Sequence, residues 1–343
     1  MNYRSIAHLS NDMRAWSATL PRDIDVVVGV PRSGLLVANL VALYRNLPLA
    51  DLNGLLEGRI LASGPRCGAP IDDAALAQRA LTILVLDDCV STGSAMREVM
   101  EQVEPLRERH TVLLGAAYYD PRANVALDVA YEPLHMPYVF EWNLMHSWVI
   151  EHGCLDMDGV LCRDPAPDEN DDGLAYERFL QEAEPYLLPS KKIARIVTSR
   201  LEKYRDLTED WLDRHGVAYE ELVMIDHASA AERDAARNHG SYKAEVYRSS
   251  KRYQLFVESE IEQARQIARW SGKPVFCVDT MEMLNPSAYP WQNESTDPAD
   301  YHQNGTTVGR MRRTMRRTSG AARAYAHEMR MWVNGLRKRL LKA

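Results

Sequence analysis

Short apolar strands alternate with helical patterns along this chain, and the alternation occurs twice. Each β-branched run ends in a turn that opens an apolar helix, and such alternation builds parallel sheets with helices on their faces. The strands of the first series are expected at 24–29, 81–86 and 111–119, with helices at 35–44 and about 94–103. The strands of the second series are expected at 154–155, 193–197, 222–225, 255–257 and 274–278. The sequence therefore predicts an α/β chain with two parallel, Rossmann-like sheets.

The length of 343 residues suits two domains, each large enough to bury its own core. The second series restarts at Gly153, so we place the boundary near 147–152. The predicted units are a first domain at 1–148, a second at 149–285 and a tail at 286–343. Segment 53–79 is rich in glycine and polar residues, and so long a loop within a domain is typical of a functional lid.

Composition indicates a soluble globular protein, with 46% hydrophobic and 26% charged residues. The five cysteines are scattered and form no CxxC pair, which favours reduced thiols over disulfides or zinc ligands. No apolar run is long enough to cross a bilayer, and the segment Met1–Arg4 contains no apolar signal core. These features predict a cytoplasmic location.

Two adjacent acids, Asp87 and Asp88, end a buried strand in the string ILVLDDCVSTGSA. Neighbouring carboxylates repel each other unless they bind something, and both can accept hydrogen bonds from vicinal sugar hydroxyls. A helix opens directly after them, and its N-terminal amides and hydroxyls can surround a phosphate. The residues of this phosphate loop are Ser91, Thr92, Gly93 and Ser94. The ordered string predicts a ribose 5-phosphate site, whereas either half alone is more often a cap or a turn.

This string resembles the signature of the type I phosphoribosyltransferases, which use 5-phosphoribosyl 1-diphosphate (PRPP). GVPRSG at Gly29–Gly34 resembles their pyrophosphate loop. The resemblance implies that Arg32 and the amides near Ser33 and Gly34 hold the diphosphate together with Mg²⁺. It covers about 1–143, and it places segment 53–79 where the family has its flexible catalytic loop.

The acceptor of the transferase is less defined by sequence. Purine-salvage members of the family often carry an acid immediately before Thr-Gly, where this chain has Ser91, so salvage of 6-oxopurines is disfavoured. An incoming hydroxyl needs a general base. Asp120 and Glu141 are the candidate bases.

A second pair of carboxylates, Asp156 and Asp158, stands two residues apart just past an apolar strand. In a phosphatase, one carboxylate attacks phosphorus to form an aspartyl phosphate, and the other protonates the leaving alkoxide and later deprotonates water. Mg²⁺ suits such a set of hard oxygen ligands. Thr198 follows the next strand, where it can bond phosphoryl oxygens, and Glu258 follows a later strand, where it can complete the metal shell. The motif DxDGV alone is also compatible with an ordinary turn at the end of a strand.

The ordered set, with Lys243 in SYKAE, resembles the haloacid dehalogenase-type phosphatases between Cys154 and Val278. The resemblance implies that Lys243 neutralises the nucleophile and the phosphate, although a lone lysine is usually a solvated surface group. ESE stands where the family commonly has two aspartates, so the choice between Glu258 and Glu260 stays open. The implied metal ligands are Asp156, Asp158 and Glu258. Small insertions predict a small cap and an open site.

A transferase that attaches phosphoribose, followed by a phosphatase, delivers plain ribose. The whole chain resembles the dual-domain ribofuranosyltransferases that add ribofuranose to bacterial surface glycans. This resemblance implies that the acceptor is a glycan hydroxyl, and the glycan is lipid-linked if the protein works at the membrane surface. Two alternatives remain open. One is a nucleoside-forming transferase and phosphatase of specialised or stress metabolism, and the other is a PRPP-sensing regulator.

The C-terminal tail is strongly basic, since after Asp300 its only acid is Glu328. Its basic residues are Arg310, Arg312, Arg313, Arg316, Arg317, Arg323, Arg330, Arg337, Lys338, Arg339 and Lys342. Apolar residues from Tyr325 to Leu340 recur at helical spacing, which predicts a basic amphipathic helix. Such a helix suits peripheral contact with an anionic membrane surface, or packing on the second domain or on a second subunit of a homo-oligomer. A nucleic-acid partner is not expected, because no aromatic-basic motif accompanies the arginines.

Overall fold

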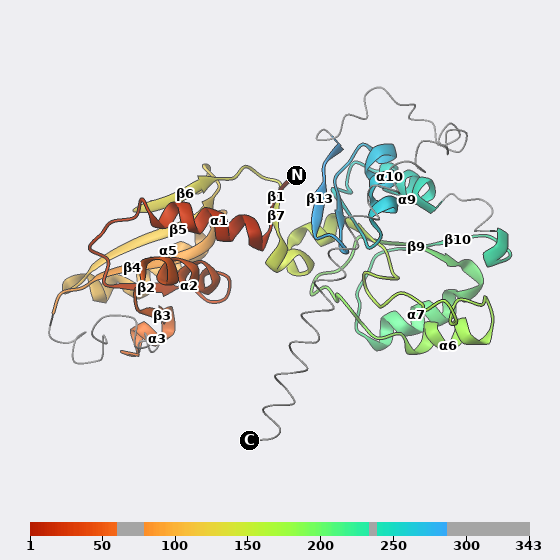
Figure 1. Cartoon of the computed structure of the whole chain (residues 1–343), viewed down its shortest axis with the longest axis horizontal. Helices are drawn as coiled ribbons and strands as arrows, with labels where there is room; N and C mark the ends of the chain where they lie inside the picture. Colours follow the sequence, from red (N-terminus) through yellow and green to blue (C-terminus); the bar gives the residue numbers. More distant parts are fainter. Residues whose placement is uncertain (60–78, 233–238, 287–343) are drawn as a thin grey trace, which may run out of the picture.

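The computed structural model describes residues 1–59, 79–232 and 239–286, and Figure 1 shows them as two α/β units. The first unit holds a five-stranded sheet and the second a six-stranded sheet, with no strand shared between them. The predicted α/β class with parallel sheets is therefore confirmed. Most of the predicted catalytic loop at 53–79 and nearly all of the tail at 286–343 lie outside the described residues.

All neighbouring strands of the first sheet are parallel. In spatial order they are β3 (Leu49–Asp51), β2 (Val26–Gly29), β4 (Thr82–Val90), β5 (Thr111–Tyr119) and β6 (Val129–Pro133). The helices of this unit are α1 (Ile6–Ser17), α2 (Gly34–Arg45), α3 (Leu52–Leu56), α5 (Ser94–Val103) and the 3₁₀ turn η1 (Glu104–Glu108). Strand β4 is longer than expected from sequence and pairs with β5 as far as Val90.

Alternation along β2 explains how helices cover both faces of the first sheet. Val27 packs in one apolar cluster with Leu9 of α1 and Val41 of α2. Val26 and Val28 point to the opposite face, where α3 and α5 cover them. A strand buried on both faces reads as a continuous apolar run, which is why the sequence revealed it.

Helix α1 was not predicted from sequence, and its local signals are clear only in the structure. Ser5 caps its N-terminus by accepting from the His8 amide at 3.1 Å, and the His8 ring accepts from the Ser5 amide at 3.2 Å. Leu9, Met13 and Trp16 recur at spacings of four and three residues and are buried. The helix is held by this apolar face against α2 and the sheet.

The second sheet is parallel except at one edge. In spatial order its strands are β10 (Leu222–Ile225), β9 (Arg195–Leu201), β8 (Gly153–Leu155), β11 (Leu255–Glu258), β12 (Val275–Cys277) and β13 (Glu282–Leu284). Its helices are α6 (Leu174–Glu182), η4 (Glu202–Tyr204), α7 (Arg205–Arg214), α9 (His239–Arg248) and α10 (Ile261–Ser271). Strand β13 was not predicted, and it is antiparallel because its short connection from β12 cannot make a crossover.

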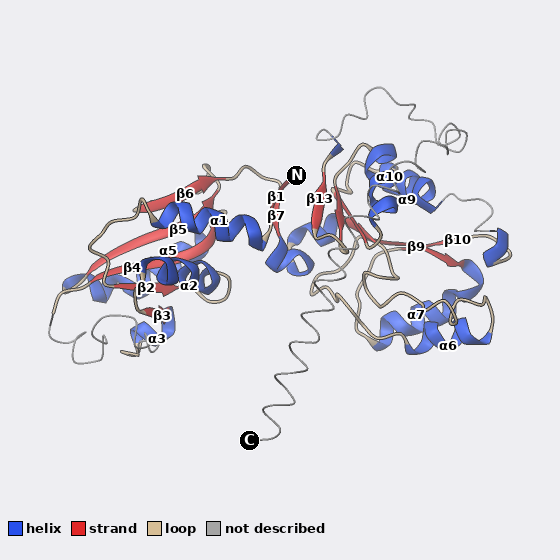
Figure 2. Cartoon of the chain, viewed as in Figure 1, coloured by secondary structure: helices blue, strands red, loops and turns tan. Residues whose placement is uncertain are grey.

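A connector joins the two units (Figure 2). It consists of β7 (Tyr138–Phe140) and the 3₁₀ turns η2 (Glu141–His146) and η3 (Trp148–His152), and η3 leads directly into β8. The N-terminal strand β1 (Asn2–Arg4) pairs in parallel with β7. The Tyr3 hydroxyl also donates to the Met281 carbonyl at 2.9 Å, and the Tyr3 ring contacts Phe276. Residues from β1 thus reach the second unit.

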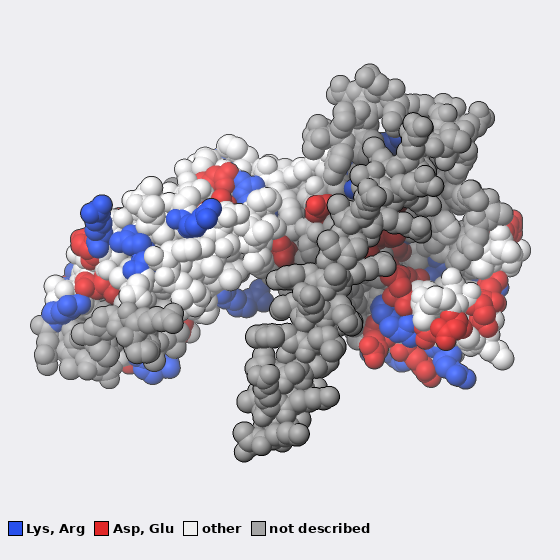
Figure 3. Space-filling model, in the orientation of Figure 1, with Lys and Arg blue, Asp and Glu red and all other residues white. Residues whose placement is uncertain are grey.

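Acidic and basic side chains are interspersed on the visible described surface in Figure 3. Arg205 of α7, for example, pairs with Glu202 at 2.5 Å and with Glu209 at 3.0 Å. None of the described helices combines the length and the apolar character needed to span a membrane.

Candidate active sites

The first site lies where two adjacent parallel strands end. Gly29 of β2 is in register with Leu86 of β4, so the GVPRSG loop and the acid pair leave the same edge of the sheet. The Val30 amide donates to the Leu86 carbonyl at 2.9 Å. A Cβ at Gly34 would lie 2.6 Å from that carbonyl oxygen and 3.0 Å from Asp87 Oδ1. Only glycine lets the loop pack this closely on the acids.

The acid pair lies inside the last part of β4, not beyond the strand as the sequence suggested, because pairing with β5 continues to Val90. Asp88 is 8% exposed and accepts from Trp142 Nε1 at 2.7 Å. Burial and the neighbouring charge of Asp88 raise the pKa of Asp87 to about 8. Burial also raises the pKa of Asp88, and the Trp142 hydrogen bond opposes that rise. Two adjacent acids, one buried and one half-buried, are held at an electrostatic cost, which is typical of a binding site.

The predicted phosphate loop follows β4 directly. Gly93 has a φ of +85°, a conformation that favours glycine, and it stands at the N-cap of α5. No side chain caps this helix, while the hydroxyls of Thr92 and Ser94 lie 3.1 Å apart. Ser91, Thr92 and Ser94 are exposed, whereas Gly93 is buried. Arg32 is also exposed and Ser33 is half-buried, on the loop beside the acids. Three exposed hydroxyl side chains thus lie at the N-terminus of α5, an arrangement suited to an anion.

Both candidate bases, Asp120 and Glu141, already accept hydrogen bonds from other groups of the protein. Asp120 accepts from Arg122 Nε at 2.9 Å and from Nη2 at 2.6 Å, and these hydrogen bonds lower the pKa of Asp120 to about 2. Glu141 accepts from the Ile6 amide at 2.9 Å and thereby holds the first turn of α1. A carboxylate with such a low pKa is a weak base, and Glu141 has a structural partner, so neither is favoured as the base by its surroundings.

We expect Asp87→Asn to stabilise the ligand-free protein at alkaline pH. The pKa of Asp87 is about 8 in the folded protein and near the ordinary value of about 4 in the unfolded chain. Between about pH 4 and about pH 8 the folded protein therefore keeps a proton on Asp87 that the unfolded chain has lost. Stability therefore falls as pH rises from about 4 to about 8, and asparagine removes this fall. Urea unfolding should show equal stability at pH 4 and a gain of at least about 1 kcal/mol at pH 8. Asp23→Asn, at an exposed position, should show no such gain; equal stability of Asp87→Asn and wild type at pH 8 would contradict the prediction.

The second site brings together three charged residues from separate elements of the second sheet unit. Asp156 follows β8, and Glu258 ends the adjacent strand β11. Lys243 of α9 lies between them, with its Nζ 2.5 Å from Asp156 Oδ2 and 2.7 Å from Glu258 Oε2. Lys243 and Glu258 are 1% and 0% exposed, so this lysine is not a solvated surface group. The Lys243 ammonium also donates to Gln263 Oε1 at 3.2 Å, a contact the sequence did not indicate.

Charge in this buried group does not balance. Burial lowers the pKa of Lys243, but Asp156 and Glu258 more than offset this, and the net pKa is raised. Burial and the charge of Asp156 raise the pKa of Glu258 to about 7. Two carboxylates share one ammonium, so the site retains an affinity for a further cation or for a proton.

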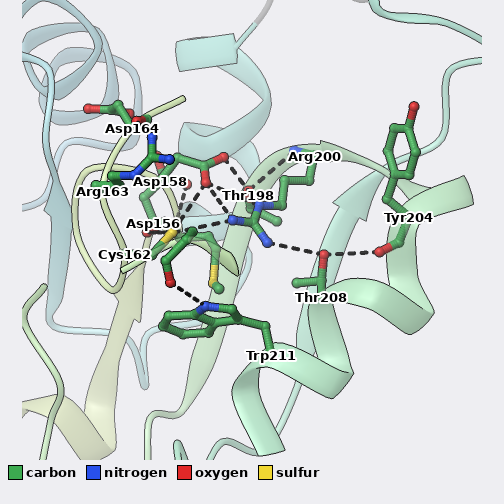
Figure 4. A network of polar contacts seen from close by, with 12 residues as sticks. Asp156, Asp158, Cys162, Arg163, Asp164, Thr198, Arg200, Tyr204, Thr208 and Trp211 are labelled. Carbon is green, nitrogen blue, oxygen red and sulfur yellow. Dashed lines mark hydrogen bonds and ion pairs between the residues drawn. The ribbon is translucent and has the colours of Figure 1, made fainter. Parts of the chain in front are cut away.

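Asp158 occupies a separate part of the site, shown in Figure 4. Its carboxylate accepts from Arg200 Nη2 at 2.6 Å and from Arg200 Nε at 3.2 Å. Arg200 is 1% exposed and also donates to Thr208 and Cys162. Arg200 was not among the site residues predicted from sequence. The available signal was its spacing of two residues from Thr198, which in a strand places both side chains on one face.

Thr198 is buried in β9 and accepts from the Arg200 amide at 3.2 Å. Figure 4 shows it near Asp158 and Arg200. The structure also distinguishes the two glutamates of ESE. Glu258 faces Asp156 through Lys243, whereas Glu260 caps α10 by accepting from the amides of Glu262 and Gln263.

The donor set of the second site fits Mg²⁺ in part. Among the described residues, no group of three or more histidine, cysteine or acidic side chains is arranged to hold a metal ion. The carboxylates of Asp156 and Glu258 flank the same lysine, but that of Asp158 is committed to Arg200. The predicted role of Asp158 as a carboxylate ligand is therefore not favoured. Mg²⁺ usually takes one or two protein carboxylates and keeps waters and substrate oxygens, which the Asp156 and Glu258 pair can accommodate.

No protein-family profile and no curated protein matches the chain. Solved structures that are similar to it include a purine phosphoribosyltransferase from Pyrococcus horikoshii, with 19% identity and a TM-score of 0.31 over 41% of this chain and 92% of that one. A xanthine-guanine-hypoxanthine phosphoribosyltransferase from Helicobacter pylori has 15% identity and a TM-score of 0.31, over 41% and 92%. The Thermus thermophilus protein TT1426 has 17% identity and a TM-score of 0.28, over 40% and 88%.

Proposed function

We propose that the chain is a bifunctional ribofuranosyltransferase. Its first unit transfers phosphoribose from PRPP to an acceptor hydroxyl, and its second unit removes the 5-phosphate. The observation that supports this most directly is that each sheet carries its own carboxylate site at its strand ends. The buried Asp156–Lys243–Glu258 group supports the phosphatase half, since two carboxylates flanking an ammonium suit an anionic substrate and a cation.

In the first unit, Asp87 and Asp88 accept hydrogen bonds from the ribose hydroxyls, and the amides of the phosphate loop hold the 5-phosphate. Arg32 and the loop beside it bind the diphosphate. The bond from ribose C1 to the diphosphate oxygen breaks, and diphosphate leaves with the electron pair. The acceptor oxygen bonds to C1, and its proton passes to a carboxylate of the acid pair.

In the second unit, Asp156 attacks the phosphorus of the phosphoribosyl product. The bond from phosphorus to ribose O5 breaks, and O5 takes a proton from Asp158, which must therefore be protonated when substrate is bound, whereas Arg200 holds it as a carboxylate in the free protein. Water then attacks the aspartyl phosphate and loses its proton to Asp158, which releases phosphate and restores Asp156. Lys243 holds the nucleophile and Thr198 bonds phosphoryl oxygens. Bound Mg²⁺, held by Asp156 and Glu258 here and by the diphosphate in the first unit, would neutralise phosphate charge.

The proposed removal of the 5-phosphate supports ribose transfer as the purpose of the fusion. A pathway that supplies nucleotides gains nothing from that step, whereas a pathway that attaches ribose requires it. The acceptor we propose is a bacterial surface glycan.

The test is to incubate the protein with PRPP, Mg²⁺ and candidate acceptors, and to follow diphosphate, phosphate and acceptor mass. We expect diphosphate and phosphate in equal amounts and an acceptor that gains a pentose without phosphate. Turnover with free nucleobases but with no glycan would favour the nucleoside-forming alternative. Absence of both products would contradict the proposal.

Glu258→Gln should lower phosphate release by about 100-fold or more, because it removes a charge from the proposed cation site. Glu260→Gln is the matched control, since Glu260 caps α10 and should affect only stability, by about 1 kcal/mol. Phosphate release from ribose 5-phosphate across a Mg²⁺ titration measures both. A larger loss for Glu260→Gln would reverse the assignment.

A further inference from the structure

A cavity of about 260 Å³ borders the acid pair of the first unit. One wall comes from the end of β4 and the residues just after it, and the other comes from the connector to the second unit. The lining includes Asp88, Ser91, Tyr138, Asn143, Ser147 and Trp148. The cavity therefore joins the place where ribose is expected to bind to the segment that leads into β8.

Among the described residues, no lysine, arginine or histidine lines this cavity, and its one carboxylate is that of Asp88. A ligand group with a carboxylate or phosphate would meet the field of Asp88 with no cationic side chain among the described lining residues. Its other polar groups are neutral, namely the Asn143 amide and the Ser91 and Ser147 hydroxyls. The lining suits a neutral ligand rich in hydroxyls.

The aromatic side chains of the cavity are not equally free to stack on a ligand. The Phe140 ring is 3% exposed and already stacks on Trp142 at 4.7 Å and on Tyr118 at 5.5 Å between centroids. Tyr138 is 7% exposed, and its hydroxyl accepts from Cys89. The remaining ring is that of Trp148, which is half-buried and meets His152 edge to face at 5.7 Å.

One indole beside an amide and hydroxyls matches a sugar residue. A sugar ring has an apolar face that packs on one aromatic ring and hydroxyls around its edge that need hydrogen-bond partners. A flat nucleobase is held best between two ring faces, which the buried Tyr138 and Phe140 do not offer.

We propose that this cavity is the acceptor subsite and that it binds a neutral sugar residue, with the ring on Trp148 and hydroxyls on Asn143 and Ser147. This assignment rests on the proposed transferase activity of the first unit. The acceptor hydroxyl then points toward Asp88, next to the ribose site. Because Trp148 begins η3 and η3 leads into β8, the acceptor lies against the connector between the two sites.

The experiment measures diphosphate release from PRPP with a panel of neutral methyl hexosides and N-acetylhexosaminides, with the methyl glycoside of glucuronic acid, and with adenine. We expect neutral glycosides to accelerate release and the uronoside and adenine not to. Trp148→Ala and Asn143→Ala should each raise the KM for the active glycoside by about tenfold and leave the KM for PRPP unchanged. Trp148→Phe should restore most of the affinity, and Tyr186→Ala, at an exposed ring of the second unit, should change nothing.

Release that is accelerated only by adenine or by the uronoside would overturn the assignment of a neutral sugar. An unchanged glycoside KM in both Trp148→Ala and Asn143→Ala would overturn the location of the subsite while the transferase stands. No diphosphate release with any acceptor would overturn the proposed transferase and this subsite with it. Titration of the protein's tryptophan fluorescence with the active glycoside measures the binding affinity independently. This affinity should be weaker in the Asn143→Ala variant, provided that the variant is folded.

Discussion

Asp156→Asn is expected to lower phosphate release by at least about 10⁴-fold while diphosphate release stays within about twofold of wild type. The amide retains the shape of the side chain and can still contact Lys243, but it cannot attack phosphorus as a carboxylate does. The proposed transferase site lies in the other sheet, so we expect its chemistry to be left intact. Mass spectrometry should then find acceptor carrying phosphopentose in the variant and bare pentose in wild type.

Asp168→Asn is the matched control for this variant, because it makes the same chemical change at an exposed position of the same unit. Both activities should stay at the wild-type level in the control. Joint loss of diphosphate and phosphate release in Asp156→Asn, with the fold intact by circular dichroism, would show that the two activities do not have separate sites.

Arg200→Met is expected to lower the free energy of unfolding by about 3–5 kcal/mol. The guanidinium is buried and holds Asp158 by several hydrogen bonds, so its removal leaves a largely buried carboxylate and the Thr208 hydroxyl without this donor. A Lys243→Met variant would also leave two carboxylates without their cation, but protonation of Glu258, whose pKa is about 7, would reduce that cost. The Arg200 variant is therefore expected to be the more severe of the two at neutral pH.

Urea unfolding of Arg200→Met beside Arg265→Met measures the effect. Arg265 pairs with Glu262 at 2.7 Å on the surface of α10, and an exposed pair of this kind contributes less than about 1 kcal/mol. Similar losses for the two variants would mean that Asp158 is solvated in the folded protein and does not depend on Arg200.

The predictions made from sequence were most accurate where a strand is buried on both faces. β2, β4, β8 and β11 read as apolar runs because helices cover them on each side, and their order along the chain indicated two parallel sheets. The short strands β1, β3, β6, β7 and β13 were missed. Their pairing depends on a neighbouring strand that supplies hydrogen bonds, not on their own pattern.

The residue types of both candidate sites were also readable from sequence, since acids and phosphate-loop residues follow strands whose ends meet at one edge. The partners of those residues were not. Contacts of 2.5–3.2 Å, between remote segments or within local turns, decide these partners. They place Glu258 against Lys243, while Glu260 caps a helix. They also pair Arg200 with Asp158 and Arg122 with Asp120.

The sequence by itself determined the fold class, the two series of strands and the acids that end them, because burial and strand-end position leave a local pattern. Only the tertiary structure decided which of those acids face a shared cation, which are neutralised by arginines, and where a cavity opens beside them. Charge pairing and cavity shape depend on which side chains the packed sheets and connector bring within hydrogen-bond distance. No local pattern in the chain specifies that proximity.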